Sequence, residues 1–290
     1  MNEKCDYPYT CQNSLKKGSV VASGGFGRVL HYENKAIKLI RDATTCRNAQ
    51  IEFSKMISMK NAIRYARRKN LSKNIRKILS RINTVQPLYF WDQSFSYRYE
   101  RFSCGIVSKF IKGIPLKDLV ETDEDINLSV LVLVSVSTRS SYLSLMDHTK
   151  PLSIDNPPRY FVMSLSDAKK FYKDIHNFES AYGYFFQMGV IMALFIFLAK
   201  MVPIDLEILL GQNNKINMLD FGMCEDIQDE DYKDPNKIAE LICHIGGPLY
   251  TKDSMEFNEQ FRKGFIKAST DFEINKEFLE KVMKGIDTHL

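Results

Sequence analysis

The stretch GSVVASGGFGRVLHYENKAIKLI, from Gly18 to Ile40, decides the fold. Its apolar and β-branched residues fall into short runs on both sides of a cluster of glycines, and Glu33-Asn34 supplies a turn before the last run. Runs of this composition between turn residues form strands. The stretch therefore predicts three antiparallel strands of a small sheet.

The glycines in this stretch are also suited to a nucleotide. A turn built from Gly24, Gly25 and Gly27 lacks Cβ atoms, so its backbone N–H groups can approach phosphates. Lys38 stands ten residues beyond Arg28, on the predicted third strand, where its ammonium can pair with the same phosphates. A plain hairpin would explain the glycines alone, but the glycines and the lysine together favour a nucleotide loop.

A second motif lies far downstream, where Asp220-Phe221-Gly222 follows the strand-like run Lys215–Leu219. With these motifs the chain resembles the protein-kinase superfamily. The GxGxxGxV pattern of that superfamily is matched from Ala22 to Val29, except that Ala22 replaces the first glycine. Its VAIK motif is matched by Ala36-Ile37-Lys38. The order and spacing of the three matches argue against coincidence.

This resemblance implies an α+β, two-lobed protein-kinase-like fold. Residues 1–112 would form an N-lobe with a small antiparallel β-sheet, and residues 113–290 a mainly helical C-lobe, with a hinge near Lys112–Pro115. The resemblance also implies ATP and Mg as cofactors, with Asp220 binding the metal and Glu52, on the following helix, pairing with Lys38. A solvated helix carboxylate is the alternative interpretation of Glu52.

The catalytic loop of active kinases, HRDxxxxN, is matched poorly. Asp205 lies fifteen residues before Asp220, in the position of the catalytic aspartate, but Pro203 replaces the histidine and Leu210 occupies the asparagine spacing. Either Glu207 substitutes as a metal ligand, or the second metal is missing. We therefore assign Asp205 and Asp220 as the catalytic candidates and leave activity open.

The stretch PIDLEILLG, from Pro203 to Gly211, also resembles the hallmark of a largely fungal family of uncharacterised proteins. The resemblance continues through Leu219-Asp220-Phe221 and into residues 247–261. It implies that the unusual catalytic loop is a trait of the family, and it implies no substrate. Members are sometimes labelled zinc-finger proteins, but no pair of cysteines or histidines here has metal-ligand spacing, so we expect no structural zinc.

Two functions remain open on the sequence. The first is an ATP-dependent phosphotransferase whose acceptor is an unknown protein or small molecule, with Asp205 positioning the acceptor hydroxyl. The second is a pseudokinase scaffold that binds nucleotide or none, which the missing loop asparagine supports. No APE motif follows Gly222, so we do not expect a platform for peptide substrates.

A strongly basic stretch runs from Lys60 to Arg81, with nine basic residues and no acidic one. It lies within a helical region predicted from near Asn48 to Ile82. The segment Glu225–Asp234 is acidic, so the two stretches could attract each other or bind separate partners. A solvated helix face is the simpler interpretation of the basic stretch, and a surface for nucleic acid or an acidic partner is the other.

Further elements follow from hydrophobic patterning. Two strands are predicted between Val85 and Ile111, and another apolar β-branched run follows at Leu128–Ser137. Helices are predicted near Asp167–His176, Pro235–Ile245 and Ser254–Ala268.

The composition, 44% hydrophobic and 26% charged, is that of a soluble globular protein. The six cysteines are scattered and form no dense framework, so we expect free thiols. Because no apolar stretch follows the first charges of the N-terminus, we expect an intracellular protein, in the cytoplasm or nucleus. The apolar stretch Tyr184–Ala199 is shorter than the roughly 20 residues that span a bilayer, so we expect a buried helix there and no membrane span.

Overall fold

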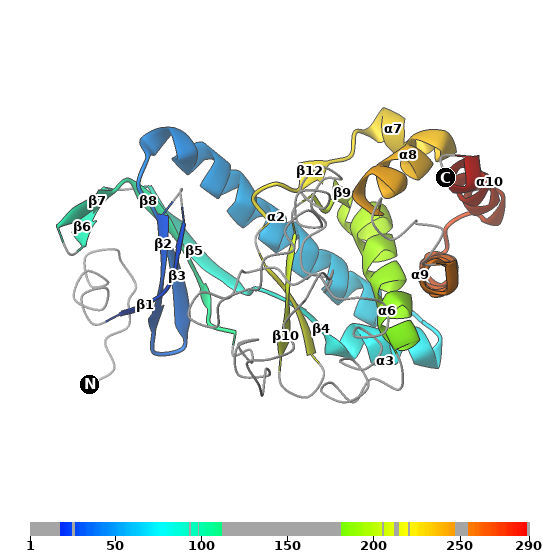
Figure 1. Ribbon diagram of the computed structural model, residues 1–290, viewed down its shortest axis with the longest axis horizontal. Coiled ribbons are helices and arrows are strands. Elements are labelled where there is room, and N and C mark those ends of the chain that lie inside the picture. Colours follow the sequence, from blue (N-terminus) through cyan, green and yellow to red (C-terminus); the bar gives the residue numbers. More distant parts are fainter. Residues whose placement is uncertain are drawn as a thin grey trace, which may run out of the picture. The chain divides into compact units, whose positions relative to one another are not determined.

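A computed structural model describes residues 18–24, 27–92, 94–97, 99–111, 181–204, 206–211, 215–219, 221–246 and 255–288. The fold is α+β, with a five-stranded antiparallel sheet and a set of helices (Figure 1). The chain divides into two compact units, one of Met1–Lys60 with Thr84–Lys112 and one of Asn61–Asn83 with Gly113–Leu290. The elements expected at Leu128–Ser137 and Asp167–His176, and the hinge near Lys112–Pro115, lie outside the described residues.

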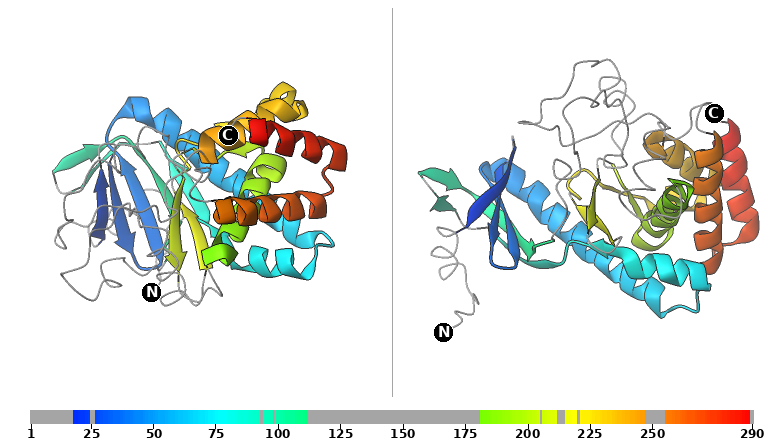
Figure 2. Two further views of the ribbon diagram at one scale, coloured as in Figure 1. Left: turned by 45° about the vertical axis from the view of Figure 1, so that its right-hand side comes forward. Right: turned by 60° about the horizontal axis from the view of Figure 1, so that its bottom comes forward.

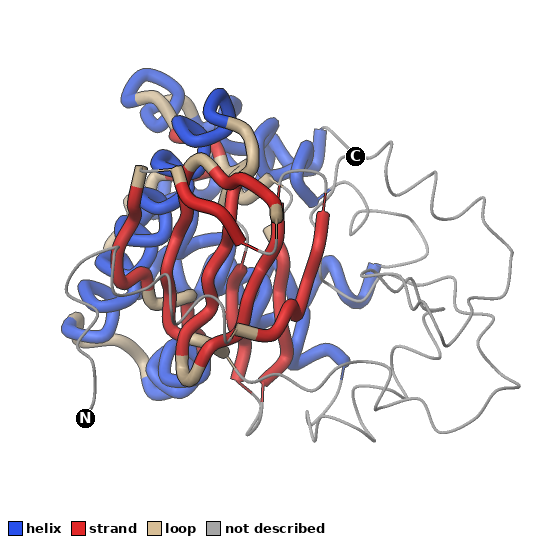
Figure 3. Tube along the Cα trace, turned by 90° about the vertical axis from the view of Figure 1, so that its left-hand side faces the viewer, coloured by secondary structure: helices blue, strands red, loops and turns tan. Residues whose placement is uncertain are grey.

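The first unit is built on the five-stranded sheet, whose order is β1-β2-β3-β8-β5. Its strands are among those drawn in red in Figure 3. All neighbouring strands run antiparallel. The strands are β1 (Ser19–Gly24), β2 (Gly27–Tyr32), β3 (Lys35–Ile40), β5 (Pro87–Trp91) and β8 (Cys104–Lys109). The three strands predicted from Gly18 to Ile40 are confirmed, and Glu33-Asn34 forms the turn between β2 and β3.

The region predicted to hold two strands after Val85 contains four. In addition to β5 and β8, a small hairpin is formed by β6 (Phe95–Tyr97) and β7 (Glu100–Phe102). The hairpin forms because the aromatic side chains of Tyr97 and Phe102 are buried in the core of the unit. The alternating pattern therefore predicted extended structure here correctly, but the prediction of two strands missed the turns that divide the region into more.

One face of the five-stranded sheet carries the core of this unit. Leu30, Ile37 and Val107 form one cross-strand row on β2, β3 and β8. In the next row the ring of Trp91 lies over Gly105, where an added Cβ would come within 2.4 Å of the ring. Because side chains alternate between the faces of a strand, Lys38 points away from this core, to the opposite face.

The opposite face is covered by the helix α2 (Ala43–Arg68), whose Phe53 ring lies 6.2 Å from that of Phe90 on β5. The boundary between the two units falls within α2, after Lys60. The helical region expected from Asn48 to Ile82 proves to be two helices, α2 and α3 (Lys73–Arg81).

The second unit contains a three-stranded sheet of order β10-β11-β4. The strands are β4 (Ile82–Thr84), β10 (Glu207–Gly211) and β11 (Lys215–Leu219), so the strand predicted at Lys215–Leu219 is confirmed. A two-stranded pairing joins β9 (Met201–Val202) to β12 (Glu225–Asp226). The helices described in the C-terminal part are α7 (Asp229–Lys233), α8 (Pro235–Gly246), α9 (Met255–Asp271) and α10 (Lys276–Thr288). The predicted α8 and α9 are confirmed, whereas α10 was not predicted.

The apolar stretch Tyr184–Ala199 lies at the centre of the second unit. It forms α6 (Ala181–Ala193) and the π-helix η2 (Leu194–Ala199), and the side chains from Met188 to Phe197 are buried, as expected. Two glycines let α6 and α9 approach closely (Figure 2). A Cβ on Gly189 would lie 2.0 Å from the carbonyl oxygen of Phe261, and one on Gly264 would lie 2.0 Å from that of Phe186. Among the described residues, no helix is long and apolar enough to cross a membrane.

Candidate functional site

The glycine-rich turn lies between β1 and β2, where Gly24 and Gly27 are opposed residues of the antiparallel ladder. Gly25 lies outside the described residues, so its approach to a ligand stays a prediction. Gly27 has a clear structural role, because a Cβ at this position would lie 1.7 Å from the carbonyl oxygen of Leu39 on β3. The tight pairing of β2 with β3 therefore requires glycine here, with or without a nucleotide.

Lys38 and Glu52 meet, as the sequence predicted. Lys38 lies on β3 opposite Ile106 of β8, and its Nζ donates to Oε1 and Oε2 of Glu52 at 2.9 and 2.8 Å. Glu52 is not the solvated carboxylate of the alternative interpretation, because it is only 4% exposed. The contact is confirmed, while a role of either residue in nucleotide binding stays a prediction.

Because Glu52 is buried, forming this ion pair costs desolvation free energy, and removing one partner leaves an uncompensated charge. Removing two charges from water carries a penalty that their mutual attraction offsets only in a good geometry, here two hydrogen bonds to one carboxylate. The Lys38 side chain keeps 30% of its surface exposed, against 5% for that of Glu52. The carboxylate is thus the buried partner and holds an ammonium that solvent still reaches.

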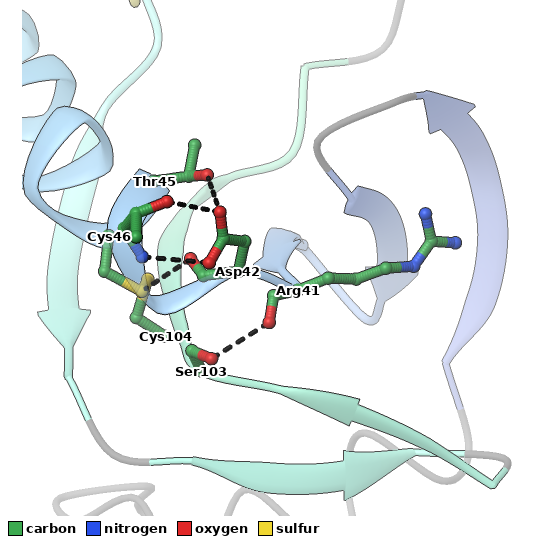
Figure 4. The surroundings of a disulfide bond; sticks show 7 residues. Arg41, Asp42, Thr45, Cys46, Ser103 and Cys104 are labelled. Atoms are coloured by element: carbon green, nitrogen blue, oxygen red, sulfur yellow. Dashed lines mark hydrogen bonds between the residues drawn. A yellow bond between two sulfur atoms is a disulfide. The ribbon is translucent and has the colours of Figure 1, made fainter.

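A disulfide holds α2 to the same face of the sheet (Figure 4). Cys46, in the first turn of α2, is bonded to Cys104, the first residue of β8, with a Cα–Cα distance of 5.9 Å. Cys104 is opposite Ile40, and Ile40 is two residues beyond Lys38, so period-two alternation puts Cys104 and Lys38 on one face. The covalent bond and the ion pair therefore tie the helix to one side of the sheet at two points.

The expectation of six free thiols is therefore wrong for Cys46 and Cys104. Their spacing of 58 residues gave no signal, because only the folded sheet and helix bring the two together. Cys224 is a buried free thiol and Cys243 a half-buried one. Disulfides are rare in reducing compartments, so scattered cysteines no longer support an intracellular location, which stays a prediction.

Asp42, the residue before α2, caps the first turn of the helix. Asp42 accepts hydrogen bonds from the Thr44 hydroxyl and, at 3.0 Å, from the Thr44 backbone N–H, and a further one from the Thr45 hydroxyl at 3.3 Å. These contacts, led by the Thr44 hydroxyl, lower the pKa of the Asp42 carboxyl. On the neighbouring segment, the Ser103 hydroxyl donates to the Arg41 carbonyl at 2.9 Å. The helix start that carries Cys46 is thus held by a side-chain cap as well as by the disulfide.

The other candidates belong to the second unit. Asp205 and Asp220 lie outside the described residues, so whether they face Lys38 stays a prediction. The β10–β11 ladder pairs Glu207 with Leu219 at its end. Glu207 is two residues after Asp205, and Leu219 directly precedes Asp220. Only the backbone of Glu207 is described, so its role as a metal ligand also stays a prediction.

Leu210, the residue at the asparagine spacing, limits how far a catalytic loop can extend. This residue, expected at the asparagine position of a catalytic loop, lies in β10 opposite Ile216. The apolar run that follows Asp205 favours a strand, so extended structure begins as early as Glu207. Any catalytic loop is therefore shorter than the HRDxxxxN pattern.

Phe221, which follows Asp220, anchors this part of the chain. It is fully buried and stacks on Phe195 of η2, with ring centroids 6.0 Å apart. Its carbonyl oxygen accepts a bond from the Cys224 backbone N–H at 3.2 Å, which closes a turn over Gly222 and Met223. Phe221 of the DFG motif thus has a packing role in the second unit.

Comparison with known proteins returned no family model that matches the chain. The search of curated proteins likewise found no match. Within the described part of the chain, no three His, Cys, Asp or Glu side chains gather as they would around a metal ion.

Proposed function

We propose that this protein binds ATP with magnesium through a kinase-like, two-lobed fold. The observation that carries the proposal is the Lys38–Glu52 ion pair, formed between a central strand and the helix packed on it, directly behind a glycine-rich hairpin. In kinases a strand lysine held in this way orients the nucleotide phosphates. The five-stranded antiparallel sheet, with α2 packed on one face, supports the same interpretation.

In the proposed reaction each candidate has a defined role. Lys38 would pair with the phosphates, and the backbone N–H groups around Gly24, Gly25 and Gly27 would contact them from the hairpin. Asp220 would hold Mg, with Glu207 as its additional oxygen ligand. Asp205 would accept the proton of the acceptor hydroxyl while the hydroxyl oxygen bonds to the γ-phosphorus of ATP and ADP leaves. The acceptor is a protein or a small molecule.

One observation favours the alternative of a pseudokinase scaffold. Leu210 occupies the asparagine spacing and lies within a strand, so a second metal would lack its usual ligand at that position. Such a protein would bind nucleotide without transferring phosphate. The two functions share a binding site and differ only in turnover.

Nucleotide binding is tested by thermal unfolding with ATP, with Mg, with both and with neither. A ligand present at about 100 times its dissociation constant stabilises the native state by about 2.7 kcal/mol. We expect this stabilisation with ATP and Mg together, and a smaller one with ATP alone. No stabilisation in any condition would eliminate ATP binding.

Three variants separate ligand binding from structural loss. Lys38→Met removes the two hydrogen bonds that Lys38 donates to the buried Glu52 carboxylate. It should destabilise the protein by about 2–3 kcal/mol, a smaller loss than for a fully buried pair because Lys38 is partly exposed. Lys38→Met/Glu52→Leu removes both charges and should recover much of that stability. Lys35→Met, on the same strand, is the matched control.

We expect the double variant to unfold near the wild-type temperature and to lose its response to ATP, while the control keeps it. A double variant that is still stabilised by ATP would show that Lys38 does not contact the nucleotide. Turnover is then measured as ATP consumption by the wild type and by Asp205→Asn and Asp220→Asn. Binding without any turnover in the wild type would favour the scaffold.

A further inference from the structure

We propose that the hairpin of α2 and α3 is a docking surface for the phosphate backbone of nucleic acid. The basic hairpin surface comprises five exposed cations, Arg64 and Arg68 on α2 and Lys73, Arg76 and Lys77 on α3. No acidic residue lies between Glu52 and Asp92 in the sequence. All five cations belong to the second unit, and the proposal does not depend on nucleotide binding.

Arg67 joins the two helices and so defines how their cations are arranged. Its guanidinium donates to the carbonyl oxygen of Leu79, at 3.2 and 2.7 Å, and to that of Ile82, at 2.9 Å. The side chain of Arg67, in the last turn of α2, is therefore bonded to the C-terminal end of α3. Arg64 and Arg68, four residues apart, project next to this contact from neighbouring positions on one face of α2.

The helix α3 is sharply divided into two faces. Ile75, Ile78 and Leu79 are buried on one side. At 3.6 residues per turn, Lys73, Arg76 and Lys77 share the opposite side, and all three are exposed. The basic residues thus form a strip along the helix.

The loop between the helices is firmly attached to the rest of the second unit. Ser72 donates to Asp271 Oδ2 of α9 from its backbone N–H at 2.9 Å and from its hydroxyl at 2.5 Å. Lys69 forms an ion pair with Glu273 and lies 5.2 Å from the centroid of the Tyr65 ring. The chain turns at these anchors, which hold the backbones of the two helices in place before any partner binds and so lower the entropic cost of binding.

The charges of this surface are left uncompensated, in contrast to those of the C-terminal helices. On α9 and α10, Lys263 pairs with Glu259 at 2.7 Å, and Lys281 pairs with Glu277 at 2.7 Å. None of the five cations of the basic hairpin surface has an ion-pair partner in the part of the chain that the structure describes. Like charges three or four residues apart on a helix repel each other, and an anionic ligand would remove this repulsion.

The chemistry of the surface favours a phosphate backbone over an acidic protein. Protein interfaces are built around buried apolar or aromatic anchors. No large hydrophobic residue of α3 is exposed. On α2, Tyr65 is the exposed large hydrophobic residue that lies in sequence between Arg64 and Arg68. Arginine and lysine side chains gathered on neighbouring helices are suited to the phosphates of a nucleic-acid backbone, and such contacts carry no base sequence information.

The test is fluorescence anisotropy of the full-length protein with labelled duplex DNA of two unrelated sequences. If all five cations neutralise phosphates, log K should fall with log salt at a slope of about −4.5, or about 500-fold weaker binding between 50 and 200 mM salt. Lys73→Gln/Arg76→Gln/Lys77→Gln should reduce the slope to about −1.8, or about 12-fold over the same range. Both sequences should bind equally.

A matched control removes three charges elsewhere. Lys263→Gln/Lys276→Gln/Lys281→Gln lowers the net charge by the same amount on α9 and α10 and should leave the salt slope unchanged. No binding at 50 mM salt, or equal loss in both triple variants, would overturn the proposal. Tighter binding to polyglutamate than to DNA would also overturn it and assign the surface to an acidic protein.

Discussion

Reduction of the Cys46–Cys104 disulfide should destabilise the first unit. In the chain-entropy model, a crosslink stabilises the folded state by restricting the unfolded chain, and the effect grows with the length of the closed loop. The two cysteines are 58 residues apart, which corresponds to about 4 kcal/mol at 25 °C. This loop contains Glu52, so the same reduction should loosen the helix that carries the carboxylate partner of Lys38.

Urea unfolding with and without a thiol reductant measures this loss. Trp91 is the only tryptophan of the chain and is buried in the core of the first unit, so its fluorescence reports on that unit specifically. We expect the urea midpoint to fall on reduction, and Cys46→Ala/Cys104→Ala to show the reduced midpoint with or without reductant. Cys243→Ala is the control, since it removes a free thiol and should retain the full response.

Two results would refute this reasoning. If oxidised and reduced protein unfold at the same urea concentration, the crosslink does not restrict the unfolded chain as argued. If thiol counting in the unfolded, oxidised protein finds Cys46 and Cys104 unbonded, the bond itself is absent in solution.

Three further predictions each concern one residue. Gly27→Ala should cost about 2–4 kcal/mol in urea unfolding, because its Cβ would collide with the carbonyl oxygen of Leu39 and force β2 from β3. Partial burial alone would raise the pKa of Asp271, but the Ser72 hydrogen bonds and the Lys267 ion pair outweigh it and lower that pKa. Asp271 should therefore stabilise the protein above the ordinary carboxyl pKa and lose this effect as the pH falls below it, which Asp271→Asn should abolish in urea midpoints measured from pH 3 to 7. Burial, assisted by the charge of Asp287, raises the pKa of Cys243 to about 11, so alkylation of this thiol should be slow at pH 8 and accelerate towards pH 11, as followed by mass spectrometry; rapid labelling at pH 8 would contradict the buried environment.

Local pattern was sufficient for several elements of the fold. The strands β1, β2 and β3 and the strand β11 were predicted because alternation and turn residues act over a few positions. The buried helix at Tyr184–Ala199 was predicted because a helix apolar on every side has no face for solvent. The contact of Lys38 with Glu52 was expected from the resemblance to kinases, and the structure shows it.

Other features depend on residues that are remote in the sequence. The basic stretch was expected to be one helix, but Ser72 is held by Asp271, which lies 199 positions away, and the chain turns there. The extra hairpin of β6 and β7 forms because the side chains of Tyr97 and Phe102 are buried in the core of the first unit. The kinase pattern placed Leu210 at the asparagine spacing, and only the pairing of β10 with β11 showed that this residue lies in a strand.

The sequence by itself determined the antiparallel hairpins around the glycines, the buried central helix and the residue types on which the proposed nucleotide binding depends. Only the tertiary structure decided that Cys46 is bonded to Cys104, that Gly27 must lack a side chain, and which cations lack an ion-pair partner among the described residues. The reason is physical. Periodicity and turn propensity are properties of neighbouring residues, whereas a disulfide, a close backbone approach and an ion pair each require two distant segments to be packed within a few ångströms.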